Sequence, residues 1–357
     1  MQGRTILIGI LFICSSSLLR GQAKYSNEFL KIGVGARALG MSNAFVATAD
    51  DVTAGYWNPA GLAHMESDFQ VSLMHSEYFA GIANYDYGAF AAKIDSVSTI
   101  GFSLIRFGVD DIPNTTQLID ANGNLDFNRV TSFSVADYAG LISYARKSRI
   151  EGLSFGGNVK IIRRIIGDFS QAWGFGFDVG AQYRTGKWVL AATGRDVTST
   201  FNAWTADLDE ETKEVFRTTG NDIPGSSVEV TLPELILAAN RKFIFSDRIG
   251  MRAEIDLKTT FDGKRNVLFK SDPISIDPSL GIEATYDNLI FLRLGVGNFQ
   301  VTSDIDGNRA TTYQPNFGVG VKLPYVSIDY ALTDIGDRSV ALYSNVFSLR
   351  IDINRKQ

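Results

Sequence analysis

The sequence predicts an all-β protein, a transmembrane antiparallel β-barrel of about 14 strands. Apolar and polar residues alternate in many segments, and the connections between these segments are tight and long in turn. No apolar run after the first residues reaches the length that a membrane-spanning helix needs, so a chain that crosses a membrane must do so as a closed barrel.

The alternation is clearest in residues 173–184. Trp173 and every second residue up to Tyr183 are apolar, whereas the positions between them hold glycine or polar residues. The segments 249–258 and 346–353 divide in the same way. A soluble β-sandwich would also alternate, with its apolar face inward, whereas a barrel in a membrane turns the apolar face to lipid.

Loop lengths favour the barrel over the sandwich. Long connections are expected at 109–134, 164–172, 197–231, 258–275 and 299–312, and tight turns between them. Outer-membrane barrels combine short periplasmic turns with long outer loops, which places both termini in the periplasm. The expected strands are 68–77, 84–94, 98–108, 135–147, 151–163, 173–184, 187–196, 232–242, 247–257, 276–287, 289–298, 313–322, 325–333 and 341–352.

Three regions are expected along the chain. Residues 1–23 resemble a signal peptide, with Arg4 before an apolar stretch and small residues before the cleavage site. Residues 24–66 form an N-terminal hatch in the lumen, and residues 67–357 form the barrel. The only cysteine, Cys14, lies in the signal, so the mature chain has no disulfide.

The charge balance excludes one class of partner. Lys and Arg number 34 against 39 Asp and Glu, a formal charge of −5, and no basic run stands out. We therefore expect no nucleic-acid partner, and outer-membrane lipid as the surroundings of the barrel.

The hatch segment interrupts the alternation. It holds two stretches rich in small residues and turn formers, 33–41 and 57–62, with an acidic pair between them. Small residues permit close backbone approach, as packing inside a lumen requires. The residues singled out are Gly33, Gly35, Ala36, Arg37, Gly40, Asp50, Asp51, Trp57, Asn58, Pro59, Ala60 and Gly61.

These stretches resemble the opening of the PorV/PorQ family, a branch of the FadL-like outer-membrane barrels. The Asn58-Pro59-Ala60 turn is similar to the wider FadL-type signature. The Gly-x-Gly-Ala-Arg-Ala pattern at 33–38, together with Trp-Asn-Pro-Ala-Gly-Leu at 57–62, narrows the resemblance to this branch. The resemblance implies a hatch-bearing barrel that takes part in the type IX secretion system of Bacteroidota. Its implied partners are the translocon, the attachment complex and secreted cargo bearing C-terminal sorting domains, for which it acts as a shuttle or adaptor.

No catalytic residue, cofactor or metal site is expected. The two histidines after the signal, His64 and His75, lack metal-ligand spacing, and no Gly-x-Ser-x-Gly elbow is present. Calcium-type fragments at 120–126 and 304–308 are incomplete; the first is better interpreted as a polar loop tip and the second as an Asp-Gly turn. An outer-membrane lipase is therefore a poor third reading, and we expect that the protein is not an enzyme.

The connection 197–231 is a candidate partner-binding loop because Phe201 and Trp204 precede an acidic run. The alternative is a short helix packed across the barrel mouth. A FadL-type channel for hydrophobic small molecules is the second functional reading. It would need an apolar lumen, whereas the residues expected to point inward are polar: Arg184, Arg252, Glu254, Asp256 and Arg350.

Overall fold

The computed structural model describes residues 26–118, 124–303, 309–333 and 343–355. The expected signal peptide lies outside these ranges, as do Asp120, Asn122, Asp304 and Asp306 of the two calcium-type fragments. Within them, no helix is both long and apolar enough to span a membrane.

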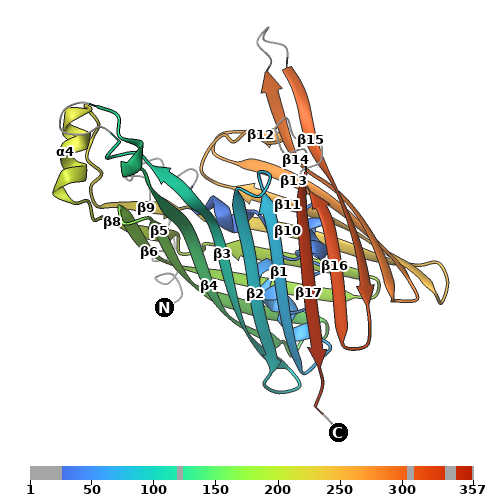
Figure 1. Ribbon diagram of the computed structural model, residues 1–357. Helices are drawn as coiled ribbons and strands as arrows, with labels where there is room; N and C mark the ends of the chain where they lie inside the picture. Colours follow the sequence, from blue (N-terminus) through green and yellow to red (C-terminus); the bar gives the residue numbers. More distant parts are fainter. Residues whose placement is uncertain (1–25, 119–123, 304–308, 334–342, 356–357) are drawn as a thin grey trace, which may run out of the picture.

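Fourteen strands close into one antiparallel barrel, as predicted (Figure 1). The first and last strands pair directly, with Leu73 opposite Leu349, so the wall has no seam at the chain ends. All fourteen overlap the predicted segments. They are β1 (Phe69–Tyr78), β2 (Ala83–Lys93), β3 (Ser98–Asn114), β4 (Thr131–Lys147), β5 (Leu153–Ile166), β6 (Ser170–Thr185), β7 (Trp188–Arg195), β10 (Glu234–Ile244), β11 (Ile249–Thr260), β13 (Ser275–Tyr286), β14 (Ile290–Ser303), β15 (Arg309–Lys322), β16 (Val326–Thr333) and β17 (Ser344–Ile353).

The apolar face of the strands points outward, which distinguishes the barrel from a sandwich. On β6, Trp173 is 51% exposed, whereas Gln182 on the other face is fully buried. Trp173 and Tyr183 are the first and last residues of the outward-facing apolar row of β6. The ten residues from one to the other span about 33 Å along the strand at a rise of about 3.3 Å per residue. With a tilt of about 40°, this gives a band about 25 Å high, which matches the apolar band of outer-membrane barrels.

The lengths of several loops differ from the prediction. Residues 164–172 were expected to form a long loop, but β5 and β6 are joined by a turn at 167–169. The loops predicted at 109–134 and 299–312 are likewise shortened, because β3 and β4, and β14 and β15, continue as hairpins (Figure 1). Outside the lipid band, both faces of a strand are in water. The strand extensions there need no alternation of apolar and polar residues, so the sequence pattern does not reveal them.

The connection between β7 and β10 carries further structure. Strand β8 (Thr200–Ala206) pairs with the loop-side half of β6, and β9 (Ser227–Thr231) pairs with β8. Helix α4 (Glu210–Thr218) joins them and stands at the outer end of this ribbon, away from the mouth (Figure 1). Short β12 (Phe269–Lys270) and η4 (Phe127–Arg129) complete the described loop side.

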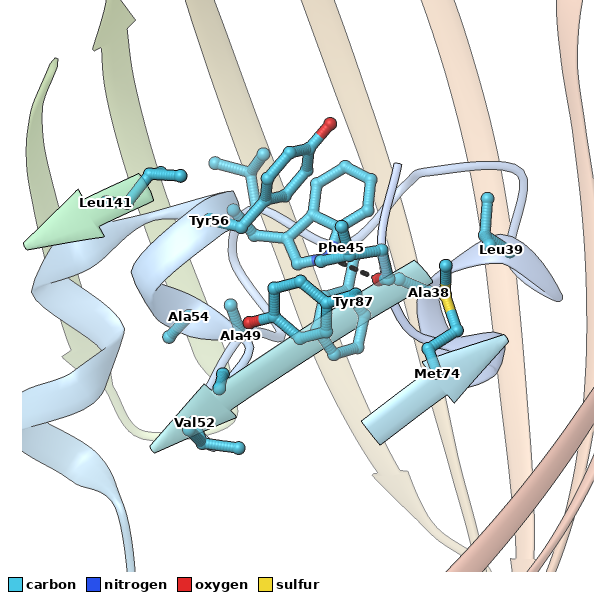
Figure 2. Packing of buried hydrophobic residues seen from close by; sticks show 14 of the residues in the cluster. Ala38, Leu39, Phe45, Ala49, Val52, Ala54, Tyr56, Met74, Tyr87 and Leu141 are labelled. Carbon is cyan, nitrogen blue, oxygen red and sulfur yellow. Dashed lines mark hydrogen bonds between the residues drawn. The ribbon is translucent and has the colours of Figure 1, made fainter. Parts of the chain in front are cut away.

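The hydrophobic core lies inside the barrel, in residues 26–66. This segment forms η2 (Glu28–Lys31), α2 (Ala36–Leu39), α3 (Ala54–Trp57) and η3 (Pro59–His64). Phe45 and Leu62 of the segment are buried. Figure 2 shows such side chains packed against Met74, Tyr87 and Leu141 of the wall. We call residues 26–66 the hatch.

Candidate functional site

The first hatch motif forms a turn followed by a short helix. Gly33 and Gly35 have φ angles of 105° and 84°, in the left-handed region that favours glycine. A Cβ on Gly33 would also lie 2.7 Å from Asn43 Oδ1. The Ala36 amide then donates to Ser348 Oγ on β17 at 2.7 Å, which fixes the start of α2 to the wall.

The second motif folds back onto the first. The indole N–H of Trp57 donates to the Val34 carbonyl at 2.9 Å. Asn58 accepts the Ala60 amide at 3.1 Å, which caps η3, and Pro59 is its first residue. Gly61 lies so close to the chain that a Cβ there would be 2.2 Å from the Ala49 carbonyl oxygen. The two stretches that carry the family resemblance thus form one packed unit.

Arg37 is the main ionic link between hatch and wall. Its guanidinium lies 3.0 Å from Asp50 and 3.2 Å from Asp51 of the hatch, and 3.0 Å from Glu283 of β13. Burial disfavours the charged form of Asp50, but Arg37 and Arg252, the latter 3.3 Å away on β11, outweigh it and hold the pKa of Asp50 well below its usual range.

The network continues through the wall. Arg293 of β14 contacts Glu283 at 2.8 Å and Asp329 of β16 at 2.6 Å. Arg350 of β17 contacts Asp51 at 2.8 Å. Charged groups of β11, β13 and β17 therefore contact Arg37, Asp50 or Asp51 directly, and those of β14 and β16 join the network through Glu283. Removing one partner of such a buried network leaves an uncompensated charge, which is strongly destabilising.

Two carboxylates of β11 hold a turn of the hatch. Asp256 accepts the amides of Phe45 and Val46 at 3.0 and 3.1 Å. Glu254 accepts the Ala47 amide at 2.7 Å and the hydroxyl of Thr48. Both carboxylates are 3% exposed, as expected for inward-pointing residues. These bonds satisfy amides that have no secondary-structure partner.

Glycines on the inner wall let the hatch backbone approach. A Cβ on Gly295 would lie 2.2 Å from the Met41 carbonyl carbon, and one on Gly156 would lie 2.4 Å from that of Pro59. A Cβ on Gly40 of the hatch would lie 2.9 Å from the Cα of Gly318 on β15. The glycines on the polar face of the strands therefore shape the inner wall to this particular hatch.

A chamber of about 460 Å³ lies on the loop side of the hatch. Its lining includes apolar Leu39 and Ile236, but also the charged Arg195, Glu234 and Lys258. Burying charged groups against a hydrocarbon would cost free energy. The chamber therefore suits a polar or mixed occupant better than a purely apolar one.

The first described residues lie on the loop side of the hatch. Asn202 of β8 donates to Asn27 Oδ1 at 2.9 Å, and Asn27 donates to Thr231 of β9 at 2.9 Å. The last described residue, Arg355, donates its amide to Asp68 at the turn side, next to the start of β1. The two described ends of the chain therefore lie at opposite ends of the barrel.

Phe201 and Trp204 lie apart from the hatch, on opposite faces of β8. Phe201 is on the outer face, with its ring centroid 6.0 Å from that of Phe175, a residue of the lipid-facing band. Trp204 points inward, and the Arg164 guanidinium lies 5.0 Å from its ring centroid. The structure therefore does not bring these two aromatics into one surface.

The two histidines have separate surroundings. His64 contacts Ser154 at 3.0 Å, and burial, with Arg184 and Lys147 nearby, lowers its pKa to about 4. His75 lies on the outer face and contacts Asp86 at 2.7 Å. No group of three or more metal-ligating side chains occurs in the described part of the chain.

Sequence reasoning missed the wall residues that receive the hatch. Glu283, Arg293 and Asp329 were not singled out, although each lies on the inward face of a spanning strand. A usable signal exists, because several charges of both signs at inward positions of neighbouring strands indicate a buried network rather than a water-filled channel.

A family profile described as "Type IX secretion system protein PorV" matches residues 22–204, about half of the 357-residue chain. Among the curated proteins, none matches the sequence.

Several solved barrels share the fold. The Pseudomonas putida toluene transporter TodX superposes with a TM-score of 0.54 at 14% identity, over 91% of this chain and 99% of that one. The Ralstonia pickettii toluene transporter TbuX gives 0.53 at 14% identity, over 90% and 99%. A Pseudomonas aeruginosa FadL homologue gives 0.51 at 14% identity, over 89% and 98%.

Proposed function

The chain belongs to the PorV family of type IX secretion system proteins, and from this premise we propose that it is a non-enzymatic outer-membrane adaptor that binds secreted cargo. In this role the barrel, residues 67–357, is closed by the hatch, residues 24–66. It receives proteins with C-terminal sorting domains from the translocon and passes them to the attachment complex at the cell surface.

The observation that carries the proposal is how the hatch is fastened. Arg37, the acidic pair and the two β11 carboxylates bond the hatch to the wall at several points. A channel needs a path past its plug, whereas an adaptor needs a rigid scaffold for binding on its rim. The fastened hatch and the charged chamber above it favour the adaptor over a channel for hydrophobic small molecules.

The surface proposed for cargo is the outer end of the β8–α4–β9 ribbon. Helix α4 carries Glu210, Glu211 and Glu214 and stands clear of the barrel (Figure 1). Its N-cap Asp209 accepts the Thr212 amide at 2.6 Å, so the acidic first turn is held in place. Each of the three glutamates also contacts a cation, namely Lys213, Arg129 or Arg217. With Asp209, acidic residues of the helix still outnumber its own two basic ones, so this excess of negative charge at the loop side suits a partner that presents a basic surface.

The test is affinity purification of the tagged protein from native outer membrane. Recovery of translocon or attachment subunits together with sorting-domain cargo is the expected result. The tagged barrel with reversed charges on α4 is compared with the tagged parent. It should still insert into the membrane but recover less cargo. Recovery of fatty acid or another apolar small molecule, with neither subunits nor cargo, would overturn the proposal in favour of the channel.

A further inference from the structure

A chain of polar contacts crosses the outer face of the wall on β1, β2 and β3, which are neighbours in the barrel (Figure 1). His75 Nδ1 lies 2.7 Å from Asp86, and His75 Nε2 lies 4.0 Å from Glu77. The Arg106 guanidinium lies 3.8 Å from Asp86 and 3.2 Å from Asp110. We call these five residues the outer polar row.

Strand register places the outer polar row on the outside of the barrel. His75 is directly opposite Asp86, and Asp86 is directly opposite Arg106, so the three side chains share one face of the sheet. The residues next to them in the sequence, such as Met74 and Ile105, are buried in the core inside the barrel. Because successive side chains of a strand point to opposite faces, the row points outward.

The outer polar row begins where the apolar surface of these strands ends early. The outward apolar residues run only from Phe69 to Leu73 on β1 and from Ile100 to Leu104 on β3. At a rise of about 3.3 Å per residue and a tilt of about 40°, each run covers about 10 Å of height, whereas the band on β6 is about 25 Å high. The Arg355 guanidinium, 5.2 Å from the Phe69 ring centroid, closes the run at the turn side. A tilt of the whole barrel would move these short runs in the membrane but would not lengthen them.

Lipid is a poor neighbour for this part of the wall. Charged side chains on the lipid-facing side of a barrel are destabilising, and more so with depth in the bilayer. Beyond the row, in the turn that joins β1 and β2, Phe79 and Ile82 are 56% and 64% exposed. Exposed apolar side chains beside polar contacts are typical of a surface that another protein covers.

We propose that the outward face of β1, β2 and β3 is a docking face for a second integral membrane protein, of different sequence, that presents basic residues at the level of the outer polar row. A partner embedded in the membrane reaches a surface that lies below the top of the apolar band. Three carboxylates of the row face one arginine, so a second copy of this chain would bring like charges together, whereas a basic wall complements them. The inference requires that the barrel lies in a membrane and does not depend on the cargo role.

Two leucines offer matched probe positions. Leu104 of β3 and Leu237 of β10 are outward-facing and 47% and 46% exposed. They lie six and seven residues from the turn-side ends of their strands, Ser98 and Ile244. Strand β10 lies across the barrel from β1, so the two probes differ mainly in the sector of the wall that they report.

The experiment places the photo-crosslinker p-benzoylphenylalanine at either leucine of the full-length protein in native outer membrane and identifies the adducts by mass spectrometry. The Leu104 position should give one main adduct, with a different protein that resists carbonate extraction, and the Leu237 position should give little of it. Reversing both ends of the row with E77K/D110K should reduce this adduct at least about tenfold, because like charges that face each other across a contact repel. The control is D287K, which reverses an exposed carboxylate that also lies beside an arginine, in the turn between β13 and β14, and should leave the adduct unchanged.

Several results would overturn the inference. Lipid adducts alone at Leu104 would show that a locally thinned bilayer covers the face. An adduct with a second copy of the chain, or with a protein that carbonate releases, would contradict the proposed partner. Equal adducts from both probes, or an adduct that E77K/D110K leaves unchanged, would contradict the proposed surface. Heat-modifiable mobility shows that the variant is folded; if E77K/D110K does not insert, E77Q/D110N, which removes the charges without reversing them, carries the same test with a smaller expected loss.

Discussion

The guanidinium of Arg37 and the carboxylate of Glu283 lie side by side, with Nε 3.0 Å from Oε2 and Nη2 3.1 Å from Oε1. This two-bond pairing joins the short hatch helix α2 to strand β13. Because Glu283 is buried and the Arg37 side chain is only 15% exposed, the pair is sensitive to any change that leaves one charge without the other.

Replacing Arg37 should therefore loosen the hatch. R37A removes the cation that Asp50, Asp51 and Glu283 share, but Arg252, Arg350 and Arg293 still contact them, so the cost should lie below the about 3–5 kcal/mol of a buried charge left without any partner. R37K keeps the charge but loses the two-bond geometry, so it should fall between R37A and the parent. The measurement is the temperature at which the heat-modifiable gel shift is lost.

The matched control is an exposed pair of the same kind. Arg217 and Glu214 of α4 are 3.0 Å apart, with side chains 53% and 66% exposed. Exposed pairs contribute about 0–1 kcal/mol, so R217A should leave the transition almost unchanged. An R37A barrel as heat-resistant as R217A would contradict the fastening role of Arg37.

The wall glycines give a second prediction. An alanine methyl at Gly295 or Gly156 would occupy space held by hatch backbone, so G295A and G156A should destabilise by about 1–3 kcal/mol, as overpacking does. Gly140 is the control, because a methyl there meets only Phe102 at 3.9 Å. Protease cleavage in the hatch should rise in the first two variants and stay at the parent level in G140A.

His64 gives a prediction for pH. Its pKa in the folded protein is about 4, below the ordinary 6.5, so the unfolded state binds the proton first as the pH falls. The His64 contribution to stability is therefore full above pH 6.5 and declines between 6.5 and 4. Thermal transitions recorded across this window should fall more steeply in the parent than in H64Q, which cannot titrate. Parallel slopes would show that His64 does not carry the effect.

The sequence predicts the barrel well because lipid imposes one simple rule on every spanning strand. All fourteen segments were found from alternation together with the placing of turns and loops, and Glu254 and Asp256 were correctly placed inside. The rule ends at the edge of the lipid, which is why the β5–β6 hairpin was taken for a long loop and β8 and β9 were missed. A short helix was considered for this connection, but across the mouth of the barrel, whereas α4 stands away from it. Partners within the lumen, such as Arg37 and Glu283, could not be predicted, because their pairing depends on how a segment without periodicity folds back onto strands more than 200 residues away.

The β8–α4–β9 ribbon is the subject of the last prediction, which rests on the proposed cargo role. Phe201 lies beside Phe175 on the lipid-facing wall, so F201A should leave cargo binding unchanged. Reversing charge on α4 with E210K, E211K and E214K should slow association of a basic sorting domain at least about tenfold at low salt, because charges at the rim act mainly on the association rate. D247K, in the turn at the opposite end, is the control. Surface plasmon resonance at two salt concentrations separates the cases: a salt-independent loss, or one shared by D247K, would count against electrostatic docking at α4.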